Sequence, residues 1–277
     1  MNIFDSHCHP QMAQYDKDRE EMLARAKSAG VSMICVGTDL ETSKQGIELA
    51  QRHDNMWASV GIHPNDITMG TMVDTMVPMV IEMLKNPKVV AIGEVGLDYY
   101  RTPEPEKQKK QKQVLEQFLN LAVKYNKPIV IHCRDSAKGT TGKAHKEMIE
   151  ILSRLYPIHD RGINTTSENK YFGVMHSFTG TKEQAEKYLE MGFCLGFNGI
   201  LTFTHQYDEV VKYVSLENIL LETDAPFLAP EPYRSKRNEP AYIIEVAKKI
   251  AELKKESSEK IIEQTALNCQ KLFNIAL

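Results

Sequence analysis

Eight short apolar runs, rich in β-branched residues, recur along the chain. Their apolar character is nearly continuous and does not alternate with polar residues, which is the pattern of parallel strands buried on both faces. The expected strands are Asn2–Asp5, Ser32–Val36, Trp57–Gly61, Val89–Gly93, Pro128–Ile131, Phe172–Met175, Phe193–Gly196 and Ile219–Leu221.

Helical patterns fill the intervals between these runs, and two more follow the last one. The expected helices are Arg19–Ala29, Thr42–Arg52, Thr71–Lys85, Glu106–Tyr125, Ala144–Tyr156, Lys182–Gly192, Tyr207–Val214, Pro240–Lys255 and Ser258–Asn274. About eight strand–helix units in succession predict an α/β fold of the (β/α)8 type, a TIM-like barrel. The alternative is a doubly wound open sheet, but no Gly-x-Gly-x-x-Gly follows the first run to support a dinucleotide site.

The 277-residue chain contains no Ser/Gly-rich linker and no abrupt change in composition, so we expect a single domain over residues 1–277. Two polar stretches, 137–143 and 158–170, are predicted as loops that either overhang the strand ends or are tolerated insertions.

The composition limits how the protein could bind a nucleic acid and in which cell compartment we expect it. With 37 acidic and 34 basic residues the formal net charge is −3, so a nucleic acid would have to be held at a local cluster rather than by the overall field. No apolar segment has the length of a signal peptide or a membrane span, which favours a cytoplasmic protein, or a nuclear one in a eukaryotic cell. Five widely spaced cysteines without a Cys-x-x-Cys are expected to be buried, reduced thiols.

Histidines, carboxylates and an arginine follow most of the apolar runs. They are His7, His9, His63, Glu94, His132, Arg134, His176 and Asp224. In a barrel the carboxyl ends of the strands converge on one rim, so these residues would form one pocket. His7 and His9 share a face if their segment is extended, which suits chelation. Imidazole and carboxylate groups can bind two adjacent divalent metals, and the absence of a thiolate cluster argues against a structural tetra-cysteine zinc site.

Seven ordered blocks of the sequence resemble the TatD-type metal-dependent deoxyribonucleases of the amidohydrolase superfamily. The blocks are Asp5-Ser6-His7-Cys8-His9, Gly61-Ile62-His63-Pro64, Gly93-Glu94-Val95-Gly96-Leu97-Asp98-Tyr99-Tyr100, His132-Cys133-Arg134, His176-Ser177-Phe178-Thr179-Gly180, Glu222-Thr223-Asp224-Ala225-Pro226-Phe227-Leu228 and Asn238-Glu239-Pro240. The fold of this family, a TIM-like barrel, agrees with the fold predicted from periodicity. Two positions depart from the family pattern, Ser177 where relatives often have Cys and Ser235 where they often have Gly.

The resemblance implies a centre with two divalent ions, Mg²⁺, Mn²⁺ or Zn²⁺. The implied ligands are His7 and His9 for the first metal, Glu94 for both, His132 and His176 for the second, and Asp224 for the first. In such a centre a water between two cations loses its proton near neutral pH and attacks phosphorus. Asp224 would take that proton as general base, and Cys8 would point away into the packing.

Four further residues are expected on the substrate side. His63 and Arg134 are candidates for phosphate contacts, because the planar guanidinium of Arg134 can hold two non-bridging oxygens. The alternative for His63 is a structural histidine before a proline. Arg234 and Asn238 are candidate substrate contacts in a loop that Ser235 would alter, since Ser tolerates positive φ less well than Gly.

The resemblance implies hydrolysis of DNA phosphodiester bonds, as a 3′–5′ exonuclease on single strands or 3′ ends, with no membrane and no obligate protein partner inferred. The alternative is a small-molecule amidohydrolase, lactonase or phosphoesterase on the same metals, because fold and metals do not choose the substrate. A barrel that binds metal only as an interaction protein is disfavoured, because every expected ligand is present.

Overall fold

The computed structural model of the chain describes residues 2–67, 73–136, 142–155 and 172–276. The predicted loop 158–170 and most of the predicted loop 137–143 lie outside these ranges. None of the helices within the described ranges is long and apolar enough to cross a bilayer.

Eight parallel strands form one sheet in the order of the sequence, from β1 to β8. The strands are β1 (Ile3–Cys8), β2 (Val31–Val36), β3 (Met56–Val60), β4 (Val89–Asp98), β5 (Ile129–Arg134), β6 (Gly173–Met175), β7 (Phe193–Phe197) and β8 (Ile219–Leu221). Beyond β8, hydrogen bonds of 2.9 Å from Asp224 N to His7 O and 2.7 Å from His9 N to Ala225 O join the last strand end to the first. The sheet is therefore a nearly closed barrel, and the predicted (β/α)8 fold is confirmed.

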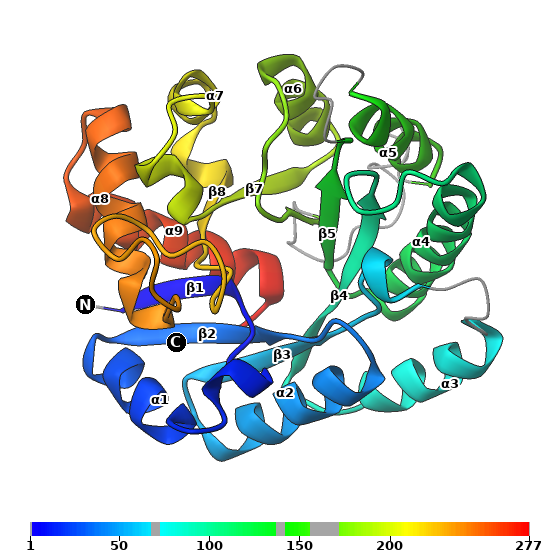
Figure 1. The fold of residues 1–277 in the computed structure, drawn as a ribbon, viewed down its shortest axis with the longest axis horizontal. Coiled ribbons are helices and arrows are strands. Elements are labelled where there is room, and N and C mark those ends of the chain that lie inside the picture. The colour runs from blue at the N-terminus through cyan, green and yellow to red at the C-terminus, as the bar shows by residue number, and fades with distance from the viewer. Residues whose placement is uncertain (1, 68–72, 137–141, 156–171, 277) are drawn as a thin grey trace.

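Helices surround the strands on the outside, as Figure 1 shows. They are α1 (Arg19–Ser28), α2 (Leu40–Arg52), α3 (Val73–Met83), α4 (Pro105–Tyr125), α5 (Lys143–Leu155), α6 (Lys182–Glu190), α7 (Asp208–Tyr213), α8 (Ile243–Lys254) and α9 (Ser258–Phe273). Local sequence sets several of their starts. Asp39 and Thr42 form a capping box at α2, and Thr181 and Gln184 form another at α6, which satisfies backbone N–H groups that have no partner inside the helix.

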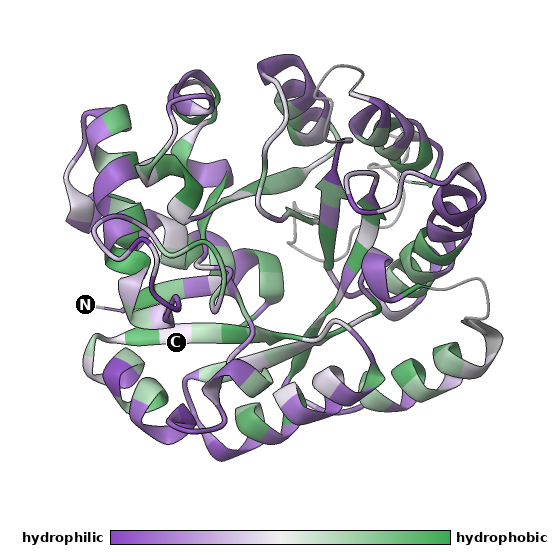
Figure 2. Ribbon diagram, in the orientation of Figure 1, coloured by the Kyte–Doolittle hydropathy of each residue, from purple (hydrophilic) through white to green (hydrophobic). Residues whose placement is uncertain are grey.

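Apolar side chains fill both the barrel interior and the layer between strands and helices. Phe4, Val90 and Val130 on the strands pack with Leu272 of α9, so this helix closes the barrel toward the amino ends of the strands. Figure 2 shows apolar strands inside and polar outer helix faces, the distribution expected of a doubly covered parallel sheet. All five cysteines are free and buried, as predicted.

Three strands extend at least three residues beyond the carboxyl ends that the sequence pattern predicted, and these extensions carry part of the site. β1, β4 and β5 continue to Cys8, Asp98 and Arg134, so several polar residues expected beyond the strands lie within them. Glycines allow β4 to pass close to β5: at Gly96, which has a φ of 154°, an added Cβ would lie 1.8 Å from the His132 carbonyl oxygen. His7, Glu94, His132 and Arg134 therefore lie within strands, whereas His9, His63, His176 and Asp224 follow directly or within three residues after a strand.

Candidate metal centre at the barrel mouth

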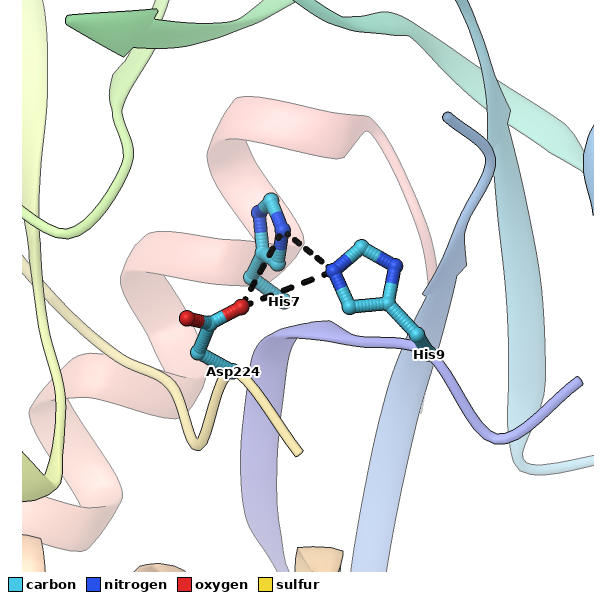
Figure 3. A group of neighbouring side chains, drawn as sticks. All are labelled: His7, His9 and Asp224. Atoms are coloured by element: carbon cyan, nitrogen blue, oxygen red, sulfur yellow. Dashed lines mark hydrogen bonds and ion pairs between the residues drawn. The ribbon is translucent and has the colours of Figure 1, made fainter. Parts of the chain in front are cut away.

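His7, His9 and Asp224 converge at the barrel mouth, the end of the barrel formed by the carboxyl ends of the strands (Figure 3). The Nε2 atoms of His7 and His9 are 3.2 Å apart, and Asp224 Oδ1 lies 3.5 Å from His9 Nε2 and 4.0 Å from His7 Nε2. Two nitrogen ligands of a tetrahedral zinc ion are separated by about 3.3 Å. The predicted first group of ligands is thus brought together with spacings that fit a divalent metal.

The backbone around this group fixes the direction of each side chain. His9 Nδ1 lies 2.8 Å from the carbonyl oxygen of Val36 and therefore carries the ring proton, which leaves the lone pair of Nε2 facing His7 and Asp224. Asp224 itself has a φ of 55°, and Asp5 beneath it accepts hydrogen bonds from the backbone and hydroxyl of Thr223. Burial raises the pKa of Asp5 to about 7, against the lowering effect of Thr223.

Glu94 lies between this group and a second set of histidines. Its Oε2 atom is 3.2 Å from His7 Nε2, and its Oε1 atom is 2.8 Å from His132 Nδ1 and 3.6 Å from His63 Nε2. The side chain is only 3% exposed, and it has no lysine or arginine partner among the described residues. One buried carboxylate thus faces both halves of the cluster, as a bridging ligand would.

His176 lies against both halves. Its ring is stacked on that of His7 with centroids 3.4 Å apart, and its Nε2 atom is 3.7 Å from Glu94 Oε1 and 3.9 Å from Asp224 Oδ1. On the other side of the ring, Nδ1 lies 3.1 Å from Glu222 Oε1, so a buried carboxylate faces Nδ1 while Nε2 faces the cluster. His176 Nε2 is therefore placed to act as a metal ligand, and it lies at similar distances from Glu94 and from Asp224.

The local partners of His63 give it a different role. Its Nδ1 atom accepts a 3.1 Å hydrogen bond from the backbone N–H of Asn65, so the proton lies on Nε2, which faces Glu94. Burial lowers the pKa of His63 to about 3, so the ring is neutral. A neutral imidazole with an Nε2–H directed into the mouth is a hydrogen-bond donor rather than a metal ligand, which favours the predicted phosphate-side role.

The charges of the cluster follow from burial and mutual attraction. Burial opposes ionisation of Glu94, but the surrounding histidines outweigh it and hold the pKa of that carboxyl well below its usual range. Burial also opposes protonation of His176, yet Glu222 and Glu94 raise its pKa to about 10. The pKa of Asp224 is likewise lowered, chiefly by its contact with His9 against the effect of burial. Because the largely buried carboxylates of Glu94 and Asp224 are ionised, they require nearby positive charge, and divalent cations would supply it.

Two carboxylates that support the ligands were not predicted from the sequence. Glu222 is fully buried, and its Oε1 atom accepts hydrogen bonds from Ser177 N at 2.7 Å and Asn198 Nδ2 at 3.2 Å while facing His176. Asp98 Oδ2 lies 3.4 Å from His132 Nε2. Both belong to sequence blocks that carry a predicted ligand, and their position in these blocks is the sequence feature from which they could have been predicted.

Of the remaining residues predicted to contact substrate, two are exposed and one is buried. Arg134 is exposed and its guanidinium lies 4.0 Å from the ring centre of Tyr100, while Arg234 is exposed and stacks on Phe203 at 3.9 Å. The position of Asn238 differs from the predicted substrate contact. It is fully buried, and its amide group donates to the carbonyl oxygens of Thr223 and Phe227 at 2.8 and 2.6 Å, so it holds the segment after β8 in place and is not free to contact substrate.

Two smaller predictions concern the neighbouring backbone. The Sγ atom of Cys8 is buried and donates to the carbonyl oxygen of Ile34 at 3.4 Å, so it points away from the mouth as expected. Ser235 has a φ of 69°, the left-handed conformation that glycine adopts more easily, in agreement with the reasoning from the sequence.

An eight-stranded α/β barrel with imidazole and carboxylate donors at its mouth defines a metal-binding barrel enzyme. A family model described as TatD related DNase matches residues 4–274. The chain is 38% identical over 276 residues to the uncharacterized metal-dependent hydrolase YabD of Bacillus subtilis, covering 99% of both chains. It is 32% identical over 286 residues to the 3′-5′ ssDNA/RNA exonuclease TatD of Citrobacter rodentium, again covering 99% of both.

A solved structure agrees with these sequence matches. The crystal structure of YJJV, a TatD homolog from Escherichia coli K12, superposes with a TM-score of 0.84 at 27% identity, covering 99% of this chain and 98% of that one. The chain therefore belongs to the TatD-related DNase family, and it is a metal-dependent hydrolase.

Proposed function

We propose that the protein is a two-metal nuclease that hydrolyses phosphodiester bonds of single-stranded DNA, one nucleotide at a time from the 3′ end. The observation that carries the proposal is the position of Glu94, whose two oxygens face His7 on one side and His132 on the other. A carboxylate placed in this way can join two divalent cations, the arrangement used for in-line displacement at phosphorus.

In this proposal the ligands are those implied by the sequence: His7, His9 and Asp224 for one ion, His132 and His176 for the other, and Glu94 for both. The side-chain ligand atoms of the first three lie within 4.8 Å of one another, and so do those of Glu94, His132 and His63. Bound there, divalent ions would polarise the phosphoryl oxygens and lower the pKa of a water near them. The identity of the ions is not set by the donors, since imidazole and carboxylate groups accept Mg²⁺, Mn²⁺ or Zn²⁺ according to supply.

Asp224 is the best-placed base for the attacking water. Its side chain is 15% exposed, whereas those of His7, Glu94 and His176 are 1 to 3% exposed. It is therefore the carboxylate of the cluster that reaches solvent at the mouth, and its lowered pKa keeps it ionised and able to accept a proton.

Two groups are placed to hold the scissile phosphate. The Nε2–H of neutral His63 faces the cluster from the β3 side. The guanidinium of Arg134 at the end of β5 has no carboxylate within ion-pair distance among the described residues, so its donors are available to non-bridging oxygens. Relatives named as 3′-5′ ssDNA/RNA exonucleases support this choice of substrate.

The test is incubation of the purified protein with Mg²⁺, Mn²⁺ or Zn²⁺ and a single-stranded DNA labelled at its 5′ end. The expected result is a ladder of products shortened one nucleotide at a time, abolished by EDTA. The same strand carrying a 3′ blocking group should resist cleavage, and an RNA strand tests whether the sugar matters. No shortening with any metal, together with turnover of a lactone or a dihydropyrimidine, would instead assign the centre to small-molecule hydrolysis.

A further inference from the structure

The arginines near the barrel mouth differ from those elsewhere in their partners. Most described arginines form ion pairs with carboxylates, namely Arg19 with Asp16, Arg25 with Glu239, Arg52 with Glu20, Arg154 with Glu116 and Arg237 with Asp18. Arg101, Arg134 and Arg234 have no such partner among the described residues. These three follow β4, end β5 and follow β8, so the described arginines without a carboxylate partner come from segments at the carboxyl ends of strands.

Large aromatic side chains are exposed in the same segments. Tyr100 is 47% exposed, Phe203 38% and Phe227 44%, although burial of each ring would be favourable by about 2 kcal/mol or more. Arg134 stacks on Tyr100 and Arg234 on Phe203, with 4.0 and 3.9 Å from guanidinium carbon to ring centre. Stacking leaves the N–H groups of Arg134 available, whereas Arg234 donates through Nη1 to the carbonyl oxygen of Ala229 at 2.7 Å and keeps its other N–H groups, so each pair offers a flat face beside phosphate donors.

One of the exposed rings lies beside the metal centre, and Arg134 and Tyr100 come from the ends of neighbouring strands. The ring of Phe227 lies 6.3 Å from that of the ligand His9. Arg134 pairs in register with Asp98, two residues before Tyr100. Phe203 ends the 3₁₀ turn Gly199–Thr202 that follows β7, and Arg234, which stacks on it, follows β8, so this pair also comes from segments that leave the carboxyl ends of strands.

We infer that Tyr100, Phe203 and Phe227 are stacking platforms for the bases of a single strand whose 3′ end lies at the metal cluster. The inference rests on the proposed function and adds the part of the substrate that the enzyme recognises. Stacking on an aromatic face tolerates every base, and a base inside a duplex is already stacked and paired. The mouth therefore selects unpaired strands without selecting a sequence.

The experiment measures steady-state cleavage of two single-stranded oligonucleotides of equal length, one natural and one with abasic tetrahydrofuran residues next to the 3′-terminal nucleotide. The variants are Tyr100→Leu and Phe203→Leu, which keep apolar volume but remove the π-face, and Tyr100→Trp, which keeps it. Tyr213→Leu is the matched control, because Tyr213 is 44% exposed beneath Lys182 but lies on α7 in the outer helix layer. Metal content and Tm of each variant show that the site is intact.

Each Leu variant should raise KM for the natural strand about 10-fold, the effect of losing one stacked base. The abasic strand should show a similar increase with the wild-type enzyme and little further increase with Tyr100→Leu or Phe203→Leu, because the same contact is already missing. Tyr213→Leu should behave as wild type, and Tyr100→Trp, which keeps a stacking face, should raise KM for the natural strand less than Tyr100→Leu does.

Two results would overturn the inference in distinguishable ways. If the wild-type enzyme cleaves natural and abasic strands with equal KM, or if both Leu variants leave KM unchanged, stacking plays no part although the nuclease assignment stands. If the wild-type enzyme cleaves neither strand with any metal, the proposed function fails and the inference falls with it. The abasic comparison needs no variant, so it decides the question even where a substitution prevents folding.

Discussion

Replacing Glu222 by Gln removes one charge and no heavy atom, and it tests how His176 is held. The carboxylate accepts hydrogen bonds from Ser177 N and Asn198 Nδ2 through Oε1, which also lies 3.1 Å from His176 Nδ1. Its Oε2 atom is buried without a hydrogen-bond partner among the described residues and faces Gly196, where an added Cβ would lie 2.3 Å away.

A glutamine fits this space in two orientations, and both are unfavourable. With its oxygen at the Oε1 position, the amide N–H₂ is buried against Gly196 without an acceptor, which costs about 1–3 kcal/mol. With its nitrogen there, it meets the donors of Ser177 and Asn198. In either orientation His176 loses the carboxylate that orients its ring, and loss of such a support lowers metal affinity or activity by roughly 10- to 100-fold.

The measurements are metal affinity, by titrating metal into the metal-free protein, and cleavage rate at saturating metal. Glu222→Gln should bind metal 10- to 100-fold more weakly, and the stability loss should lower Tm by roughly 2–10 °C. Glu263→Gln on the exposed face of α9 makes the same chemical change away from the site and should alter neither quantity. A Glu222→Gln enzyme with wild-type metal affinity would refute the argument, even if its Tm fell.

Three further predictions concern the cluster and the fold. Glu94→Ala should lower kcat roughly 10³-fold or more, since several kcal/mol of metal assistance are lost, while circular dichroism shows an intact barrel; an active variant would contradict the bridging assignment. Arg134→Ala and His63→Ala should each lower kcat/KM roughly 10- to 100-fold with metal content unchanged, and release of metal would mean that the residue is a ligand. Arg237 holds the pKa of Asp18 at about 2, below its ordinary 3.8, so this pair stabilises the fold above pH 4 and the effect is lost as pH falls toward 2. The Tm of Asp18→Asn should therefore fall less than that of the wild type over this range, and parallel curves would show that the pair contributes nothing.

The strands were predictable because a parallel barrel buries both faces of each strand, which leaves continuous apolar runs in the sequence. The carboxyl ends of β2, β6 and β8 were predicted correctly, but those of β1, β4 and β5 were not, because the apolar runs stop where side chains turn polar, whereas backbone pairing continues. Glu94 illustrates this, since it lies in the middle of β4 although the apolar pattern ends at Gly93. In β4, the first polar side chain therefore marks the start of the candidate site and not the end of the strand.

The residues proposed as ligands were predictable from their positions at strand ends, but the buried polar residues that support them were not. Glu222 and Asn238 are both polar, both fully buried and both in or beside the segment that carries Asp224. One faces a ligand histidine, whereas the other ties two backbone carbonyls together. Which of the two occurs depends on the path of the chain after β8, where Asp224, Leu228 and Ser235 adopt positive φ. A sequence pattern does not specify such a path when none of these positions is glycine.

The different roles proposed for the histidines also depend on local backbone contacts. His9 and His63 are chemically identical and both follow a strand, but the first donates Nδ1–H to the carbonyl oxygen of Val36 and the second accepts at Nδ1 from the N–H of Asn65. A carbonyl group leaves Nε2 as a lone pair for a metal, whereas an N–H group leaves it as a donor for an anion. Because each backbone partner is fixed by a neighbouring turn or strand, the barrel presents ligands on its β1 side and a phosphate donor on its β3 side. The positions of the histidines at strand ends thus indicated a metal centre, and in the proposed enzyme two backbone groups decide that His9 would bind metal and that His63 would be left for substrate.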